Sequence, residues 1–368
     1  MGWILLVVVL LVVFLVVQVV HLSVVLTWED QQTVGLGYYG RPPGERAAFK
    51  ARLRTQARLL RPILRLIGRF NRFTFEKASF QQDGLAGPRG TCNPESFADA
   101  RRYVPSAEDV FVVTQMKCGT TWMQQVVYET VMRGHGDLVE RGTTLYAISP
   151  WIEARKSVGV REAPRVGDER PSRIIKTHLP ATACPWSPEA KYIYVARHPV
   201  SCFASCVDFI ATNAGALAPP LDVSEAWFRS PEWMWWGTWT DHVAGWWDQA
   251  QQHPNVLFVH FEEMKADPGA IVDRVAAFLG LRPLDAEERA AVVRKSGFAY
   301  MQEHQDTFEM HPPHILAVDA QLFVRGTSDR HKDVPPDVRS RLSAWCAQEM
   351  STRAYPLQET YPDVSGSG

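Results

Sequence analysis

The sequence predicts an α/β fold in which a central parallel sheet is flanked by helices and preceded by one transmembrane helix. Three observations support this prediction. From about residue 107 onward, continuous apolar runs alternate with segments of helical spacing, a pattern typical of a parallel sheet covered on both faces. One of these runs leads through a glycine-containing loop directly into a helix. Residues 4–20 are apolar except for Gln18, as a membrane-spanning helix requires.

The composition excludes several classes of protein. The chain has 368 residues, 46% of them apolar and 21% charged, with a formal net charge of −1. These values exclude a disordered or collagenous chain, and the near-zero charge disfavours a nucleic-acid partner. The spacing of the six cysteines indicates no disulfide framework. His198, Cys202 and Cys206 share a helical face that could begin a zinc site, but without an evident fourth ligand a packed helix face is the favoured interpretation.

The N-terminal segment is predicted to be an uncleaved membrane anchor over residues 1–28. As a helix its apolar stretch spans about 36 Å, enough to cross a bilayer. Trp3 and Trp28 bracket it at positions that suit the two interfaces. The alternative is a cleaved signal peptide. Such peptides have a positively charged start, a shorter apolar core and a small-residue cleavage site, and none of the three is clear here.

Basic residues are distributed asymmetrically around this segment. The first 40 residues contain no Lys or Arg, whereas residues 41–77 contain eleven. Because cytoplasmic flanks carry the excess of Lys and Arg, this asymmetry predicts a single-pass membrane protein with the bulk of the chain in the cytoplasm. A luminal domain of the type II kind is the alternative.

The juxtamembrane segment, residues 29–100, is predicted to contain a basic amphipathic helix. Its arginines recur at spacings of three or four residues: Arg54, Arg58, Arg61, Arg65, Arg69 and Arg72. An apolar stripe lies beside them, formed by Leu53, Leu60, Leu64 and Ile67. Pro62 is expected to kink the helix. Two interpretations are equally open: an interfacial helix attracted to anionic lipid, or a helix packed on the folded domain with solvated arginines.

The folded domain is predicted over residues 101–356, followed by a flexible tail over residues 357–368. Its expected strands are residues 109–114, 172–176, 191–196 and 256–261. Its expected helices are residues 120–133, 200–212, 238–252, 268–279 and 286–294. The tail ends in Ser-Gly-Ser-Gly, a composition that favours disorder.

The segment FVVTQMKCGTTW, residues 111–122, has the chemistry of an anion site. A buried strand leads into a loop with Lys117 and Gly119, and Thr120 and Thr121 open the following helix. Backbone N–H groups at a helix N-terminus point toward an anion, glycine lets the backbone approach it, and lysine adds a mobile positive charge. The arrangement is P-loop-like, although the NTPase pattern GxxxxGK[ST] is absent. A threonine-capped turn between strand and helix is the alternative.

This loop resembles the 5′-phosphosulfate loop, TYPKSGTTW, of the cytosolic-type sulfotransferases. Further segments resemble motifs of that family and occur in its order: RIIKTHLP, KYIYVARHPVSCFAS, GTWTDHVAGWW, VLFVHFEEMKADP and KSGFAYM. The resemblance covers roughly residues 100–350. It implies an enzyme that transfers a sulfuryl group from 3′-phosphoadenosine 5′-phosphosulfate (PAPS) to a hydroxyl or amine of an acceptor, without a metal.

The resemblance also implies roles for individual residues. It makes His178 the base that takes the acceptor proton, a task that suits a histidine. It makes Lys117 and Lys176 the cations that neutralise the sulfuryl group and the departing phosphate. The residues implied to bind the cofactor are Lys117, Gly119, Thr120, Thr121, Trp122, Arg197, Ser205, Phe261, Ser296, Phe298, Arg325 and Gly326. Of these, Arg197 and Ser205 belong to the 3′-phosphate motif, and the rings of Trp122 and Phe298 either sandwich the adenine or belong to the core.

Two departures from the family pattern affect the cofactor site. Phe261 stands where the family usually has Tyr, and Val324 stands at an Arg position in the segment 323–332. One cation for the 3′-phosphate is therefore missing, and we expect weaker cofactor binding or substitution by Arg330 or Lys332. The segment after Lys332 lacks most of the family's dimer pattern, so the sequence leaves the oligomeric state open.

Tryptophans crowd the segment expected to face the acceptor. Seven of the 13 lie between Trp227 and Trp247. Trp233, Trp235 and Trp236 are expected either to form an apolar acceptor wall or to touch the bilayer. Together with the anchor they favour a small-molecule or lipid-like acceptor, such as a lipid, sterol or phenolic hydroxyl. The alternatives are another phosphotransferase, or a membrane-surface adaptor that kept the fold and lost the activity.

Overall fold

Four parallel strands form the centre of the folded domain. The computed structural model describes residues 2–26, 37–70, 74–155, 157–309, 323, 326 and 328–365. Strands β3 (Asp109–Val113), β4 (Arg173–Thr177), β5 (Lys191–Ala196) and β6 (Val256–His260) lie in the order β4-β3-β5-β6. Each pairing between them is parallel, so the predicted sheet is confirmed.

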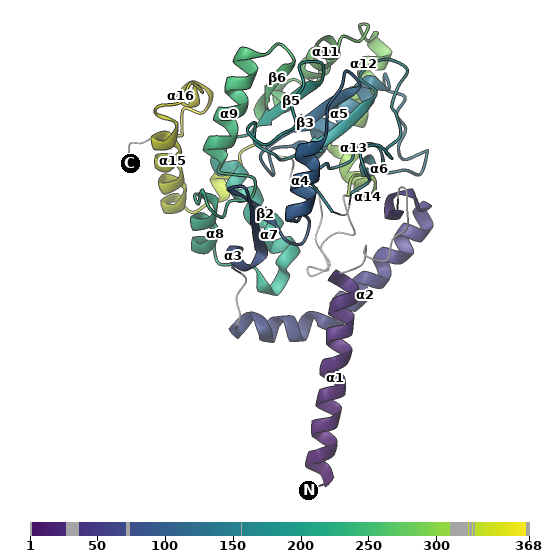
Figure 1. The fold of residues 1–368 in the computed structure, drawn as a ribbon, viewed down its shortest axis with the longest axis vertical. Coiled ribbons are helices and arrows are strands. Elements are labelled where there is room, and N and C mark those ends of the chain that lie inside the picture. The colour runs from purple at the N-terminus through teal and green to yellow at the C-terminus, as the bar shows by residue number, and fades with distance from the viewer. Residues whose placement is uncertain are drawn as a thin grey trace.

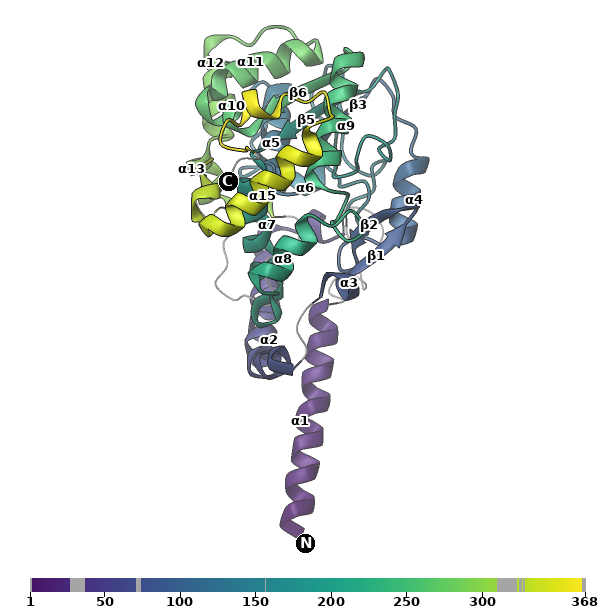
Figure 2. The ribbon, with the colours of Figure 1, turned by 90° about the vertical axis from the view of Figure 1, so that its left-hand side faces the viewer.

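Helices cover both faces of this sheet (Figures 1 and 2). Successive side chains of β3 alternate between two cores, with Val110 and Val112 in one and Phe111 and Val113 in the other. The first face is covered by α5 (Thr120–Val131), α11 (Pro268–Leu279) and α12 (Ala286–Lys295), and the second by α7 (Pro199–Ala214), α9 (Trp239–Gln252) and α15 (Pro336–Met350). Because both faces are buried, the strands are continuously apolar, which made them recognisable in the sequence.

Shorter elements surround this core, with 3₁₀ helices labelled η. They are η1 (Gly37–Gly40), α3 (Phe75–Ala78), β1 (Ser79–Gln82), β2 (Leu85–Pro88), α4 (Pro94–Arg102), α6 (Leu145–Ile148), η2 (Gly215–Leu217), α8 (Leu221–Phe228), α10 (Phe261–Ala266), α13 (Phe298–Glu303), α14 (Gln305–Phe308), η3 (Arg330–Asp333) and α16 (Leu357–Thr360). Strands β1 and β2 form an antiparallel hairpin. Phe75, Phe80 and Phe97 are buried in the same core as the sheet, so residues before the predicted domain start at residue 101 also pack on the domain.

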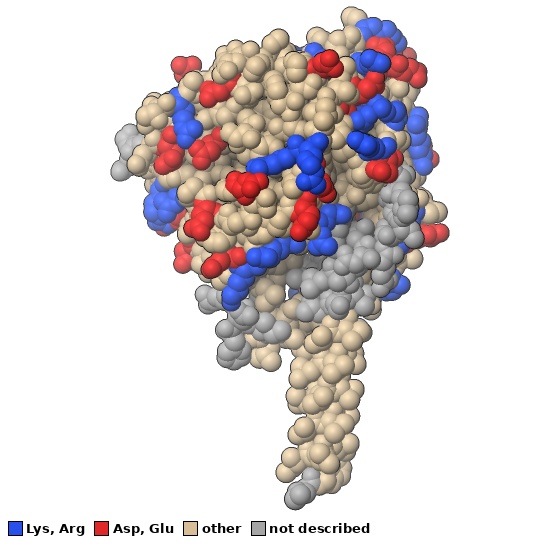
Figure 3. Space-filling view, viewed as in Figure 1, with Lys and Arg blue, Asp and Glu red and all other residues tan. Residues whose placement is uncertain are grey.

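Helix α1 (Gly2–Leu26) projects from the folded domain. Its stretch Gly2–Val20 is long and apolar enough to cross a membrane, and almost none of it is buried in the protein. Figure 3 shows the helix as a rod without Lys, Arg, Asp or Glu on the visible face. A membrane anchor and a signal sequence share these properties, so the helix fits the predicted anchor and its alternative equally.

Helix α2 (Pro43–Phe70) packs its apolar stripe on the folded domain. Leu53, Leu60 and Leu64 are buried in a cluster with Tyr146 and Val158 of the domain. Of the two interpretations of this helix, packing on the domain is therefore the correct one for the apolar stripe. The opposite side of the helix stays exposed and carries Arg58, Arg61 and Arg65.

The path of α2 changes direction along its length. Figures 1 and 2 show two segments that meet at a bend, and Pro62 lies inside the helix. Proline lacks the N–H that continues the helical hydrogen bonds, so a bend in this helix agrees with the expectation from the sequence. The side chains of Ile67 and Arg69, and the whole of Arg72, lie outside the described part of the chain.

The C-terminal segment is packed on the domain as far as residue 364. Leu357, Tyr361 and Val364 are buried, and the Tyr361 hydroxyl donates to the Glu262 carboxylate over 3.1 Å. A free tail beginning at residue 357 is therefore a wrong prediction for residues 357–364, because three well-spaced apolar side chains suffice to hold this segment. Residues 366–368 lie outside the described part of the chain.

Candidate active site

The loop between β3 and α5 is shaped by a glycine. Gly119 precedes α5 with φ +102°, a left-handed conformation that favours glycine. A Cβ atom at this position would lie 2.8 Å from the Phe261 ring, so a larger residue does not fit. Thr120 opens the helix, with its hydroxyl 2.6 Å from that of Thr114. The loop thus leaves the backbone N–H groups at the start of a 12-residue helix facing the end of the sheet.

Three cations converge at this loop. Lys117 lies within it, Lys176 lies on β4, and Arg197 follows β5. Arg197 donates from Nη1 to the Lys117 carbonyl oxygen over 3.0 Å. Burial, together with the nearby charges of Arg197 and Lys176, lowers the pKa of Lys117 to about 8. A buried lysine close to two further cations favours a bound anion.

Aromatic rings hold the two lysines. The ammonium of Lys117 lies 4.7 Å from the centre of the Phe209 ring, and that of Lys176 lies 3.7 Å from the centre of the Trp151 ring. In the part of the chain that the structure describes, neither ammonium has a carboxylate within ion-pair distance. Both charges therefore remain available to a ligand.

Among the residues that the structure describes, His178 is held with one ring nitrogen free to accept a proton. Its Nδ1 lies 2.9 Å from the Thr114 carbonyl oxygen, and because a carbonyl only accepts, Nδ1 carries the hydrogen and Nε2 carries the lone pair. The rings of Trp151 and Trp236 lie 5.1 Å and 4.8 Å from the imidazole. Burial, reinforced by the charge of Lys176, lowers the pKa of His178 well below its ordinary value. The imidazole is therefore a neutral, oriented base.

Glu153 supports this histidine and was not predicted from the sequence. One carboxylate oxygen accepts the His178 backbone N–H over 2.7 Å, and the other accepts the Thr177 hydroxyl over 2.9 Å. From the opposite side, His242 Nε2 lies 2.9 Å from the His178 carbonyl oxygen. Glu153 is fully buried, and burial raises its pKa. It is a single acid in an irregular loop, and no motif in the sequence marks it.

Of the predicted 3′-phosphate residues, Arg197 lies just before α7 and Ser205 lies within it. The Arg197 guanidinium lies 4.5 Å from the centre of the Phe261 ring, so Phe261 is placed beside both Arg197 and Gly119. Ser205 is half-buried on α7. On either side of Ser205, Cys202 and Cys206 are fully buried, which confirms the packed helix face predicted for them.

The predicted substitutes for the missing cation are engaged elsewhere. Arg330 pairs with Asp208 and Asp333, and the exposed Lys332 pairs with Asp329 over 3.5 Å. The expectation that Arg330 or Lys332 replaces the missing cation is therefore not supported by these contacts. Val324 and Arg325 lie outside the described part of the chain.

The predicted adenine residues lie on separate elements, Trp122 on α5 and Phe298 at the start of α13, which follows α12. Trp122 on α5 meets Phe261 edge to face at 5.4 Å, and α5 packs against α12, which Ser296 ends. The Ser296 hydroxyl donates to its own helix, at the Val292 carbonyl oxygen. Gly326 has φ +56°, and a Cβ atom there would lie 2.3 Å from the Phe298 ring, so this glycine is required by close packing.

Two tryptophans of the predicted acceptor segment are buried, and one of them lies beside the base. Trp235 and Trp236 are buried, and Trp233 packs against the same core. The bilayer contact considered for these residues is therefore wrong for Trp235 and Trp236. Trp236 instead forms, with Trp151, an apolar surface beside His178.

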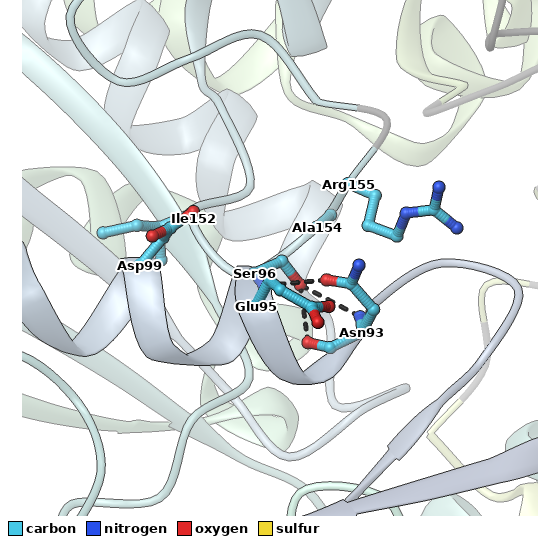
Figure 4. A pocket seen from close by; sticks show the side chains of 7 residues that line it. All are labelled: Asn93, Glu95, Ser96, Asp99, Ile152, Ala154 and Arg155. Atoms are coloured by element: carbon cyan, nitrogen blue, oxygen red, sulfur yellow. Dashed lines mark hydrogen bonds between the residues drawn. The ribbon is translucent and has the colours of Figure 1, made fainter.

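A pocket beside α4 is separate from this arrangement. It is lined by Asn93, Glu95, Ser96, Asp99, Ile152, Ala154 and Arg155 (Figure 4). With two carboxylates and one guanidinium it does not suit a polyanion, and none of the predicted site residues lines it.

Comparison with known proteins identifies the family. Residues 107–353 match the sulfotransferase domain. The chain belongs to the PAPS-dependent sulfotransferase family. This sulfotransferase is 32% identical to mouse Sulfotransferase 2B1 over 299 residues, which cover 78% of this chain and 86% of the mouse protein. Its activity is sulfuryl transfer to an acceptor hydroxyl.

Solved structures share the fold of this sulfotransferase. Mouse sulfotransferase SULT7A1 complexed with PAP has a TM-score of 0.54 and 22% identity, covering 75% of this chain and 95% of the mouse chain. Retinol dehydratase in complex with androsterone and the inactive cofactor PAP has a TM-score of 0.57 and 17% identity, covering 77% and 95%. These similarities confirm the α/β fold with a central parallel sheet.

Proposed function

We propose that this sulfotransferase binds PAPS at the Lys117 loop and uses His178 as its catalytic base. One observation carries the proposal. Thr114 joins the two parts directly, since its carbonyl oxygen fixes His178 and its hydroxyl contacts Thr120 at the start of α5. The free Nε2 lone pair and the converging cations therefore belong to one site.

The reaction assigns a task to each of these groups. The Nε2 of His178 takes the proton of the acceptor hydroxyl as that oxygen forms a bond to sulfur. The bond between sulfur and the 5′-phosphate oxygen breaks, which leaves PAP and a sulfate ester. Lys117, Lys176 and the N–H groups at the start of α5 stabilise the charge that develops on the transferring and leaving oxygens. Gly119 permits the backbone to approach those oxygens.

The rest of the cofactor is proposed to lie along α7 and α5. Arg197 has the planar fork that binds a phosphate bidentately, and Ser205 lies two turns farther along α7. Trp122, Phe261 and Phe298 offer aromatic surface for the adenine. The contact of Arg197 with the Lys117 carbonyl oxygen, over 3.0 Å, supports a single extended site for both phosphate groups.

The test is transfer of labelled sulfate from PAPS to a panel of acceptors by the full chain in membranes. We expect a labelled sulfate ester and stoichiometric PAP. Turnover of ATP in place of PAPS would favour another phosphotransferase. PAP binding without transfer to any acceptor would favour a binding protein that has lost the activity.

The pH dependence of kcat/KM provides a second test, since it reports the ionisations of the free enzyme. A base is active when deprotonated, and the pKa of His178 lies well below 6.5, so activity should persist below pH 6.5. On the alkaline side Lys117 loses its charge above a pKa of about 8, so kcat/KM should fall there. An acid-side inflection at or above pH 6.5 would show that burial does not lower the pKa of His178 in the free enzyme.

The acceptor is proposed to be an amphipathic hydroxyl compound, such as a lipid, sterol or phenol. The rings of Trp151 and Trp236 beside the base support this, and a structural relative holds androsterone. A preference for membrane-embedded over soluble acceptors of the same hydroxyl class is expected in vesicle assays. Equal kcat/KM on both would count against it.

The membrane arrangement is also a proposal. α1 would anchor the chain, with the exposed arginines of α2 near anionic headgroups and the catalytic domain in the cytoplasm. Protease treatment of sealed vesicles tests this. Cleavage of the domain from the cytoplasmic side supports the proposal, and full protection would place the domain in the lumen.

A further inference from the structure

A juxtamembrane segment that lies outside the sulfotransferase match packs against the catalytic domain next to the active site. The match begins at residue 107, yet η1 and α2 share a buried cluster with residues of the catalytic domain. From the juxtamembrane side it contains Tyr38, Tyr39, Phe49, Leu53, Leu60 and Leu64, and from the domain Tyr146, Ala147, Val158 and Ala163. The anchor-proximal helix is thus built into the core next to the site.

Polar contacts hold the start of α2 to the domain. The ammonium of Lys50 pairs with the carboxylates of Glu309 and Asp306, and Lys50 and Glu309 are both buried. Arg46 donates to the Gly142 carbonyl oxygen over 3.0 Å. A Cβ atom on Gly142 would lie 3.0 Å from the Pro43 ring, so the start of α2 is in close contact with the loop at Gly142. These contacts come from separate parts of the domain and fix the position of α2.

Tyr146 links this cluster to the reacting groups. Its ring is 3% exposed and lies in the cluster. Its hydroxyl points the other way, 3.4 Å from the Lys176 ammonium and 3.3 Å from the Thr121 hydroxyl. The residue lies on α6, whose first turn is capped by the Thr144 side chain.

Lys176 depends on such a contact for its position. A lysine ammonium sits on a flexible stem, and in the described part of the chain this one is held by the Tyr146 hydroxyl and the Trp151 ring. We infer that Tyr146 is a positioning residue through which the docking of α2 fixes the Lys176 ammonium for catalysis. The inference rests on the catalytic role proposed above for Lys176.

The first test removes only the hydroxyl. Tyr146→Phe keeps the ring and its packing, and it should lower kcat about tenfold, the value of a hydrogen bond to a charged group. The KM for PAPS and the affinity for PAP should change less than twofold. Tyr128→Phe is the matched control, because it removes another buried tyrosine hydroxyl, which donates to Gly136 away from the cations. It should leave kcat unchanged.

The second test loosens α2 from outside the site. Leu60→Ala removes a buried contact of α2, whereas Leu66→Ala alters an exposed leucine of the same helix. Leu60→Ala should lower kcat several-fold without a matching change in KM, and Leu66→Ala should not. Combined with Tyr146→Phe, Leu60→Ala should have little additional effect, since both act on one contact.

The outcomes separate this inference from the proposed function. If the unmodified chain transfers sulfate and Tyr146→Phe keeps its full kcat, the inference is wrong and the proposed function stands. Independent, multiplicative effects of the two substitutions would also overturn the link between α2 and Lys176. If the unmodified chain transfers sulfate to no acceptor, the proposed function itself fails.

Discussion

Replacing His178 with alanine should lower kcat by about 10²–10⁴-fold, the usual contribution of a general base, and leave PAP binding intact. The geometry gives the reason. Nδ1 is committed to the Thr114 carbonyl oxygen over 2.9 Å, so Nε2 alone is left to take the acceptor proton. Sulfate transfer at saturating PAPS measures the first effect, and calorimetric titration with PAP measures the second.

Two further variants make this result specific. His178 is buried, so alanine leaves a cavity, and His178→Gln fills more of that space without supplying a base. The alanine and glutamine variants of His178 should lose sulfate transfer to a similar extent. His135→Ala changes an exposed histidine and should leave kcat unchanged. Full activity of either His178 variant, or a loss of PAP affinity as large as the loss of rate, would refute the assignment.

The sheet and the reacting groups were predictable from the sequence because their signals are local. A parallel strand buried on both faces is continuously apolar, so β3 and its neighbours stand out within a few residues. Lys117 and His178 each belong to a short ordered motif, and the structure brings both motifs to Thr114. In such cases the local pattern and the fold agree.

The residues that were missed depend on contacts distant in sequence. Glu153 reaches His178 from a loop 25 positions earlier, and Tyr146 reaches Lys176 across 30 positions. Single polar or aromatic residues in irregular segments carry no periodicity, so only the fold reveals such partners. The apolar stripe of α2 was ambiguous for a related reason: the same leucine spacing suits a lipid surface and a protein core, and the burial of Leu60 decides between them.

Replacing Lys117 with methionine should weaken sulfate transfer and PAP binding without lowering the stability of the free protein. The substitution keeps the length of the side chain and removes its charge. Transfer should fall by about 10²–10³-fold, as when one preorganised group of a charge-stabilising site is lost. PAP should bind about 10–100-fold more weakly, in contrast to His178→Ala, because a contact to a charged group contributes to binding itself. Lys265→Met, at an exposed position, is the control and should change neither.

The stability of the free enzyme should change in the opposite direction to its activity when Lys117 is replaced. Burial and the charges of Arg197 and Lys176 lower the pKa of Lys117 to about 8, so between that value and its ordinary 10.5 the unfolded chain holds more protons than the folded one. The stability of the free protein therefore rises with pH across this window, and the charged lysine is destabilising below it. Lys117→Met should accordingly melt at the same temperature as the unmodified chain or higher at pH 7, while the increase in melting temperature caused by PAP shrinks. A marked drop in the melting temperature of the free variant would show that Lys117 stabilises the fold, and the anion site would then lose its main electrostatic argument.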